Sequence, residues 1–134
     1  METSRPIVWI LGDCLLDRQR YVTYSRQSPE EPTCPVGVGE RAEWALGGAA
    51  NVARWLAGLG VAHRTNLIAH YSRTDPHAGV LAECLRAAGI TQCCHLDRRD
   101  GRLTVKERIY LQEPGKGYQQ VIRVDQDTDM ELSQ

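Results

Sequence analysis

The sequence of 134 residues lacks the features of several classes of protein. No apolar run approaches the length of a membrane span, so an integral membrane protein is not expected. The first six residues lead directly into a short apolar stretch and lack the layout of a signal peptide. The net charge is −1 and the 16 basic residues are scattered, so the chain has no electrostatic footprint for nucleic acid. These features predict one modest cytoplasmic domain.

A metal-binding or disulfide pattern is also lacking. The five cysteines are odd in number, and their spacing fits neither a zinc module nor a disulfide framework. We expect all of them to be reduced thiols. The four histidines show no ligand spacing, so the sequence predicts no metal site.

What the sequence does contain is an alternation of strands and helices. The continuous apolar run at 6–12 predicts a strand that is buried on both faces of a parallel sheet. Further core strands are expected at 65–71 and 90–96, and helices at 48–59 and 76–88. The order strand, helix, strand implies right-handed crossovers and a parallel sheet, and hence an α/β architecture within a single partial domain spanning 1–134.

Helical periodicity predicts which side of each helix is buried. In the first helix, Ala49, Val52, Leu56 and Leu59 recur at spacings of three and four and form the expected stripe. The second helix should begin with a cap at Thr74 or Asp75 and Pro76 in its first turn. Its expected buried residues are Val80, Leu81, Cys84, Leu85 and Ala88.

Two segments outside this core have the character of a β flap or lid. The segment at 18–40 is polar and contains three prolines, which predict short edge strands at 21–24 and 35–38. The segment at 102–125 predicts an antiparallel hairpin around the turn at 113–117. We expect the hairpin to add to the flap.

A candidate ligand site lies where the first strand ends and the first helix begins. Gly47 and Gly48 precede the helix, and Asn51 lies in its first turn, where backbone N–H groups favour an oxygen-rich ligand. Asp13 and Asp17 follow the first strand, and ligands of open α/β sheets bind just beyond strand ends. The alternative is structural: the glycines form only a turn, Asp13 caps a turn, and Asp17 is solvated.

Three motifs together resemble the ribokinase-like (PfkB) carbohydrate kinases. They are Leu-Gly-Asp-Cys-Leu-Leu-Asp-Arg at 11–18, Ser-Arg-Gln-Ser-Pro-Glu-Glu-Pro at 25–32 and Leu-Gly-Gly-Ala-Ala-Asn-Val-Ala at 46–53. The middle motif favours the heptose-7-phosphate kinases of ADP-heptose synthesis. The later segments at 104–106 and 121–125 resemble lid strands of the same family.

The resemblance implies a Rossmann-like α/β core and a β lid that closes over the sugar and often forms a dimer interface. By position, two aspartates would bind sugar hydroxyls, the helix start would line the pocket, and two cations would bind the sugar phosphate. These substrate-binding residues are, in that order, Asp13 and Asp17; Gly47, Gly48 and Asn51; and Lys106 and Arg26.

The chain departs from the family pattern in two places. A glycine-bearing segment with an acidic residue is replaced at 69–76, where Tyr71 or Arg73 is expected to crowd the pocket. The sequence also contains no Gly-x-Gly-Asp, the motif that supplies the general base and anion hole in the family. No cofactor site is expected in this chain, since ATP and Mg²⁺ are implied only for the complete family, and phosphoryl transfer requires a positioned donor.

Two functions remain open. The first is the sugar-binding and lid half of a carbohydrate kinase, inactive alone, with a sugar phosphate as ligand. The alternative is a non-catalytic module that binds a sugar phosphate or dimerises through its lid. A dinucleotide-binding unit is disfavoured because no Gly-x-Gly-x-x-Gly follows the first strand. A half-domain would leave a sheet edge and helix faces uncovered, so self-association through a second copy or the other half is expected.

Overall fold

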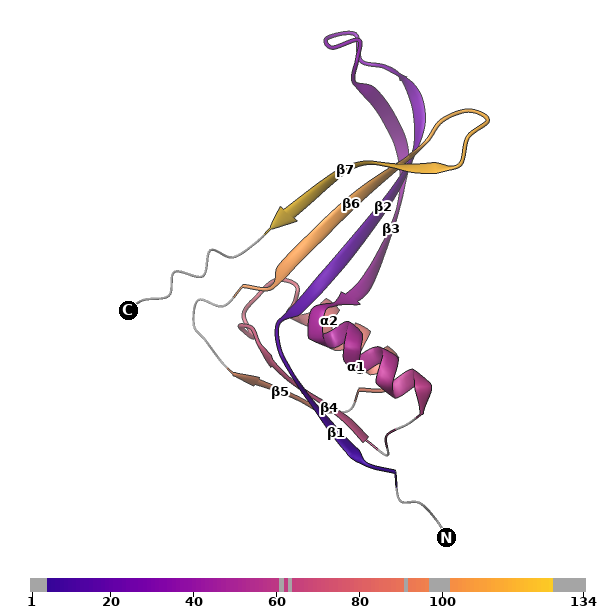
Figure 1. Ribbon diagram of the computed structural model, residues 1–134. Coiled ribbons are helices and arrows are strands. Elements are labelled where there is room, and N and C mark those ends of the chain that lie inside the picture. Colours follow the sequence, from indigo (N-terminus) through magenta and orange to yellow (C-terminus); the bar gives the residue numbers. More distant parts are fainter. Residues whose placement is uncertain (1–4, 61, 63, 91, 97–101, 127–134) are drawn as a thin grey trace.

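The computed structural model describes residues 5–60, 62, 64–90, 92–96 and 102–126. It contains a small parallel sheet with two helices and a longer, mainly antiparallel sheet that projects away from them (Figure 1). The chain passes from one part to the other after Leu11, after Gly47 and between Leu96 and Thr104. The ligand site predicted from the sequence lies at this junction.

The parallel sheet has the strand order β1-β4-β5, as the α/β prediction requires. Its strands are β1 (Ile7–Leu11), β4 (Arg64–His70) and β5 (Gln92–Leu96). They coincide with the three predicted core strands to within two residues. Helix α1 (Gly48–Leu59) begins and ends where it was expected, and Gly60 closes it in the left-handed conformation.

The second sheet has the order β3-β2-β6-β7. Its strands are β2 (Cys14–Gln27), β3 (Pro35–Gly47), β6 (Thr104–Gln112) and β7 (Tyr118–Gln126). The predicted hairpin is present as β6 and β7, which pair antiparallel. The two expected lid segments therefore meet in one sheet, where β2 and β6 pair in parallel.

The prediction of short edge strands in the first lid segment is wrong. β2 and β3 have 14 and 13 residues, and β2 lies inside the sheet between β3 and β6. The reason is where the prolines lie: Pro29 and Pro32 are in the loop, and Pro35 is the first residue of β3. None of them interrupts a ladder, because proline is tolerated at the start of a strand.

The core forms where the two sheets and the helices meet. Leu16 and Leu46 come from the base of the longer sheet, and Leu67 comes from the centre of β4. Leu81 and Leu85 of α2 (Ala78–Ala87) are buried, and Val80, Cys84 and Ala88 pack against them, as predicted. This helix starts after His77, later than expected, because Asp75 caps the preceding turn instead.

The predicted buried stripe of α1 is wrong in part: Ala49 packs against the core as expected, but the fully buried residues are others. Ala50 and Ala53 are fully buried, whereas Val52 and Leu59 are 51% and 66% exposed. The helix carries apolar residues around most of its circumference, so periodicity alone does not select a face. The structure selects the alanines, whose small side chains let α1 approach the sheet closely.

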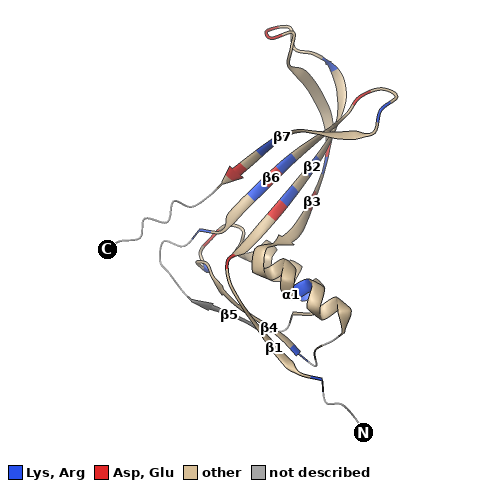
Figure 2. Ribbon diagram, in the orientation of Figure 1, with Lys and Arg blue, Asp and Glu red and all other residues tan. Residues whose placement is uncertain are grey.

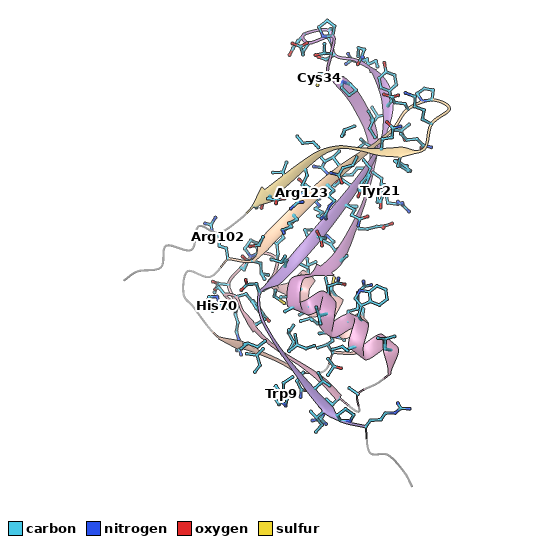
Figure 3. The ribbon with its side chains drawn as sticks, viewed as in Figure 1. Trp9, Tyr21, Cys34, His70, Arg102 and Arg123 are labelled. Carbon is cyan, nitrogen blue, oxygen red and sulfur yellow. The ribbon has the colours of Figure 1, made fainter. Side chains whose placement is uncertain are left out.

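Strand β1 is not buried on both faces, which also corrects the prediction. Ile10 packs against the core, but Ile7, Trp9 and Leu11 are exposed, Leu11 at 75%. Trp9 projects from the side of β1 that faces away from α1 (Figure 3). No described segment covers this face of the sheet. Neither described helix is long and apolar enough to cross a membrane.

Candidate functional site

The junction between the sheets is held by backbone contacts around Asp13 and Gly48. The carbonyl oxygen of Asp13 accepts a hydrogen bond from the Ala49 N–H at 2.9 Å. Gly48 has a φ of 56°, and a Cβ added there would lie 2.3 Å from that same carbonyl oxygen. Only glycine fits this position without a backbone shift. Gly48 and the main chain of Asp13 therefore hold the turn before α1. This is the structural alternative that the sequence left open for these two residues.

Asp17 brings a carboxylate to the start of α1. A Cβ added to Gly47 would lie 3.0 Å from Asp17 Oδ2, so the carboxylate rests against the bare backbone of this glycine. The other oxygen, Oδ1, accepts a hydrogen bond from Arg108 Nη1 in an ion pair. Asp17 is therefore not simply solvated. Four of the predicted site residues, Asp13, Asp17, Gly47 and Gly48, lie together.

Asn51 lies in the first turn of α1, three residues after Gly48. Its Oδ1 accepts hydrogen bonds from Arg54 Nε at 3.1 Å and Nη2 at 2.9 Å. The acceptor side of the amide is therefore used within the helix, and a ligand would have to displace Arg54 to reach it. The Ala49 N–H, the next donor after Gly48, is also occupied by Asp13.

The two predicted phosphate ligands lie in different places. Lys106 on β6 is the register partner of Asp17 on β2, so both side chains emerge on the same face of the sheet. Arg26 is nine residues further along β2, which at the usual strand rise is about 30 Å away. The structure therefore groups Lys106 with the site and separates Arg26 from it.

Further charges lie on the face that carries Asp17. Arg108 and Arg123 are opposite each other on β6 and β7, and Lys106 is opposite Asp125. Figure 2 marks the acidic and basic residues along β2, β6 and β7, including those of the opposite face. Asp125 holds Arg123 through two hydrogen bonds of 2.7 and 2.6 Å, and these bonds hold the pKa of that carboxyl below its usual value.

Sequence reasoning did not identify Arg108. The signal was present, because residues two apart on a strand share a face and Lys106 was already a candidate. What the sequence lacked was the parallel pairing of β2 with β6, which places Arg108 within reach of Asp17.

The opposite face of the longer sheet carries a separate network of charges. Arg18 and Arg20 on β2 form ion pairs with Glu40 on β3 and Glu107 on β6. The two hydrogen bonds from Arg20 lower the pKa of Glu40, and Glu40 in turn raises the pKa of Arg20. Arg18 also lies over the ring of Trp44. This network links three strands on the face opposite to Asp17, so we assign it to stability.

A shallow pocket of about 230 Å³ lies between α1, α2 and β3. Its lining is mainly apolar: Trp44, Ala45, Leu46, Arg54, Cys84, Ala87 and Ala88. Burial raises the pKa of the Cys84 thiol, so it is a weak nucleophile at neutral pH. The pocket contains none of the predicted substrate-binding residues.

The segment after β4, where the sequence departs from the family pattern, is held by Asp75. This carboxylate is 3% exposed and accepts backbone N–H bonds from His77 at 2.7 Å and Leu103 at 2.9 Å. It joins the start of α2 to the start of β6. Tyr71 is part of the buried core, and Arg73 is exposed. Among the described residues no cluster of metal ligands is present.

No family model matches the sequence. The bifunctional protein HldE of Pseudomonas aeruginosa (strain LESB58) is 37% identical over 118 residues, which cover 88% of this chain and 23% of HldE. A carbohydrate kinase from Agrobacterium tumefaciens superposes with a TM-score of 0.64 at 23% identity, covering 90% of this chain and 35% of the kinase. Arabidopsis thaliana ribokinase, solved with ribose and ATP, superposes with a TM-score of 0.52 at 16% identity, covering 91% and 36%.

The matches therefore span nearly all of this chain but about a quarter of HldE and a third of the solved kinases. They confirm the resemblance read from the motifs at 11–18 and 46–53. The chain is thus a homologue of part of HldE and has the ribokinase-like fold of the carbohydrate kinases.

Proposed function

We propose that this chain is the sugar-binding face and lid of a heptose-7-phosphate kinase-like protein. The observation that carries the proposal is the carboxylate of Asp17 resting on Gly47 at the start of α1. A carboxylate oxygen accepts hydrogen bonds from hydroxyls, and a bare glycine backbone leaves room for a sugar ring. Asp13, Gly48 and Asn51 complete the same junction, and Lys106 provides a cation for the sugar phosphate.

The proposed reaction of the complete family is phosphoryl transfer from ATP, with Mg²⁺, to a sugar hydroxyl. This chain contributes substrate binding, and its sequence contains no Gly-x-Gly-Asp to provide a base. A sugar held at Gly47 without an aligned phosphoryl donor is bound but not phosphorylated. The chain alone is therefore expected to bind a sugar phosphate and to show no turnover with ATP and Mg²⁺.

Isothermal titration with D-glycero-D-manno-heptose 7-phosphate tests the binding. Asp17→Asn should weaken binding by about 10-fold or more, because a hydrogen bond to a charged group contributes roughly 1.5–3 kcal/mol. Glu43→Gln is the matched control: it removes one negative charge on a neighbouring strand, from a side chain that pairs with Arg41. Equal affinities for all three proteins would refute the assignment of Asp17, and robust turnover would refute the lack of activity.

The second candidate function is dimerisation through the lid. Every residue of β7 is exposed, including the apolar residues Tyr118, Val121, Ile122 and Val124. Such a strand at a sheet edge is a template for pairing with another chain. Sedimentation of the wild type and of Ile122→Lys tests this function: a dimer that dissociates in the variant supports it, and a wild-type monomer at high concentration refutes it.

A further inference from the structure

The two oxygens of the Asp17 carboxylate have different neighbours. Oδ2 lies against Gly47, where the proposed sugar would sit, while Oδ1 accepts a hydrogen bond from Arg108. The side chains of Arg108 and Asp17 are 24% and 22% exposed, so both charges are largely removed from water. An anion that reaches Arg108 therefore competes directly with Asp17.

The neighbours of Arg108 indicate which anion would succeed. Lys106 precedes it by two residues on the same face of β6, and Arg123 lies opposite it on β7. Arg123 is paired with Asp125 and Arg41 with Glu43, so neither of these arginines adds net charge. Lys106 and Arg108 have one carboxylate between them, that of Asp17, which leaves a surplus of one positive charge beside the site. A phosphate dianion offers more charge than a carboxylate and pairs bidentately with a guanidinium.

Arg108 is the arginine of this face that pairs with Asp17, a residue of the proposed site. Arg123 is held by both oxygens of Asp125 at the outer strand, and in Figure 3 it lies on the lid, away from the helices. Asp17 would keep a cationic neighbour if Arg108 moved, because Lys106 is its register partner. Exchange of Arg108 from Asp17 to a phosphate therefore leaves neither Asp17 nor Arg108 without an opposite charge.

We propose that Arg108 makes the site selective for phosphorylated sugars. Without ligand it occupies Asp17 Oδ1; when a sugar phosphate binds, it transfers to the phosphate and frees the whole carboxylate for sugar hydroxyls. A sugar without a phosphate cannot displace Arg108 and binds to the restrained carboxylate. This inference rests on the proposed function and names the residue that sets its substrate class.

The test compares D-glycero-D-manno-heptose 7-phosphate with the same heptose without its phosphate, using NMR titration of the full chain because the second ligand is expected to bind weakly. Arg108→Gln should weaken binding of the phosphate ester by about 10- to 100-fold, the size of one or two lost charged hydrogen bonds. The same variant should bind the unphosphorylated sugar as well as the wild type or better, since Asp17 is released. Arg108→Lys should bind the ester with intermediate affinity. The matched control is Arg123→Gln. Its affinity for either ligand should differ from that of the wild type by less than about 3-fold.

The outcomes separate the two proposals. If Arg108→Gln weakens both ligands equally, or if Arg123→Gln loses as much affinity for the ester, the selectivity assigned to Arg108 is wrong although sugar binding stands. If Arg108→Gln binds the ester as tightly as the wild type, the selectivity assigned to Arg108 is again wrong. If the wild type binds neither ligand, the proposed function fails and this inference fails with it. Unchanged amide spectra outside the site confirm that each variant is folded.

Discussion

Substitution of Gly48 by alanine is expected to be among the most destabilising single changes in the chain. Gly48 combines a φ of 56° with a carbonyl oxygen of Asp13 that would lie 2.3 Å from the new Cβ. The left-handed backbone costs a non-glycine residue about 1–2 kcal/mol. Relief of the clash requires Asp13 to move, which breaks its 2.9 Å bond from the Ala49 N–H. That loss contributes about 1 kcal/mol, for a total of about 2–3 kcal/mol.

Two other glycines separate the contributions. Gly115, in the turn between β6 and β7, has a φ of 73° and nothing within 4 Å of an added Cβ. Gly115→Ala should therefore cost only the backbone term, about 1 kcal/mol. Gly58 lies in the last turn of α1 with open space around it. Gly58→Ala should stabilise the protein by about 0.5–1 kcal/mol, because alanine loses less backbone freedom in a helix.

Urea unfolding, followed by circular dichroism and tryptophan fluorescence, measures all three free energies of unfolding. The expected order of stability is Gly58→Ala, wild type, Gly115→Ala, Gly48→Ala. The m-value should be unchanged if the variants unfold in one step. If the free energies of unfolding of Gly48→Ala and Gly115→Ala differ by less than about 0.5 kcal/mol, the contact with Asp13 imposes no constraint. A difference of that size between two distant single changes can normally be measured. The structural role assigned to Gly48 would then be wrong.

Three further predictions concern the core and its uncovered faces. Asp75→Asn should lower the free energy of unfolding by about 1–3 kcal/mol, because one of two buried backbone N–H groups loses its charged acceptor; an unchanged urea midpoint would contradict the link to Leu103. Alkylation of Cys84 by iodoacetamide, followed by peptide mass mapping, should require a higher pH than a free thiol, because burial raises its pKa and the thiolate forms later; rapid labelling at pH 7 would refute this. Combining Leu11→Ser with Trp55→Ser should reduce self-association in sedimentation, since both exposed side chains lie on uncovered faces; a monomeric wild type would refute the prediction.

Features that depend on neighbouring residues were predictable from the sequence. Helix α1 begins at Gly48 because two glycines are followed by a run of alanines, and it ends before Gly60, a residue free to adopt the left-handed conformation. The turn at 113–117 and its hairpin follow from proline and glycine at fixed positions. The motifs around Asp13 and Gly47 were sufficient to identify the fold, because they combine residue type with spacing.

Other features depend on which segments pair and pack, and only the tertiary structure decided them. The stripe of α1 moved to Ala50 and Ala53 because its approach to β4 selected small side chains from a helix apolar on most sides. The exposed face of β1 depends on what covers the sheet, which a hydrophobic run cannot indicate. Arg108 contacts Asp17, 91 residues earlier in the chain, because β2 and β6 pair in parallel. Local sequence determines conformations, but a contact between distant segments depends on the register of the whole sheet.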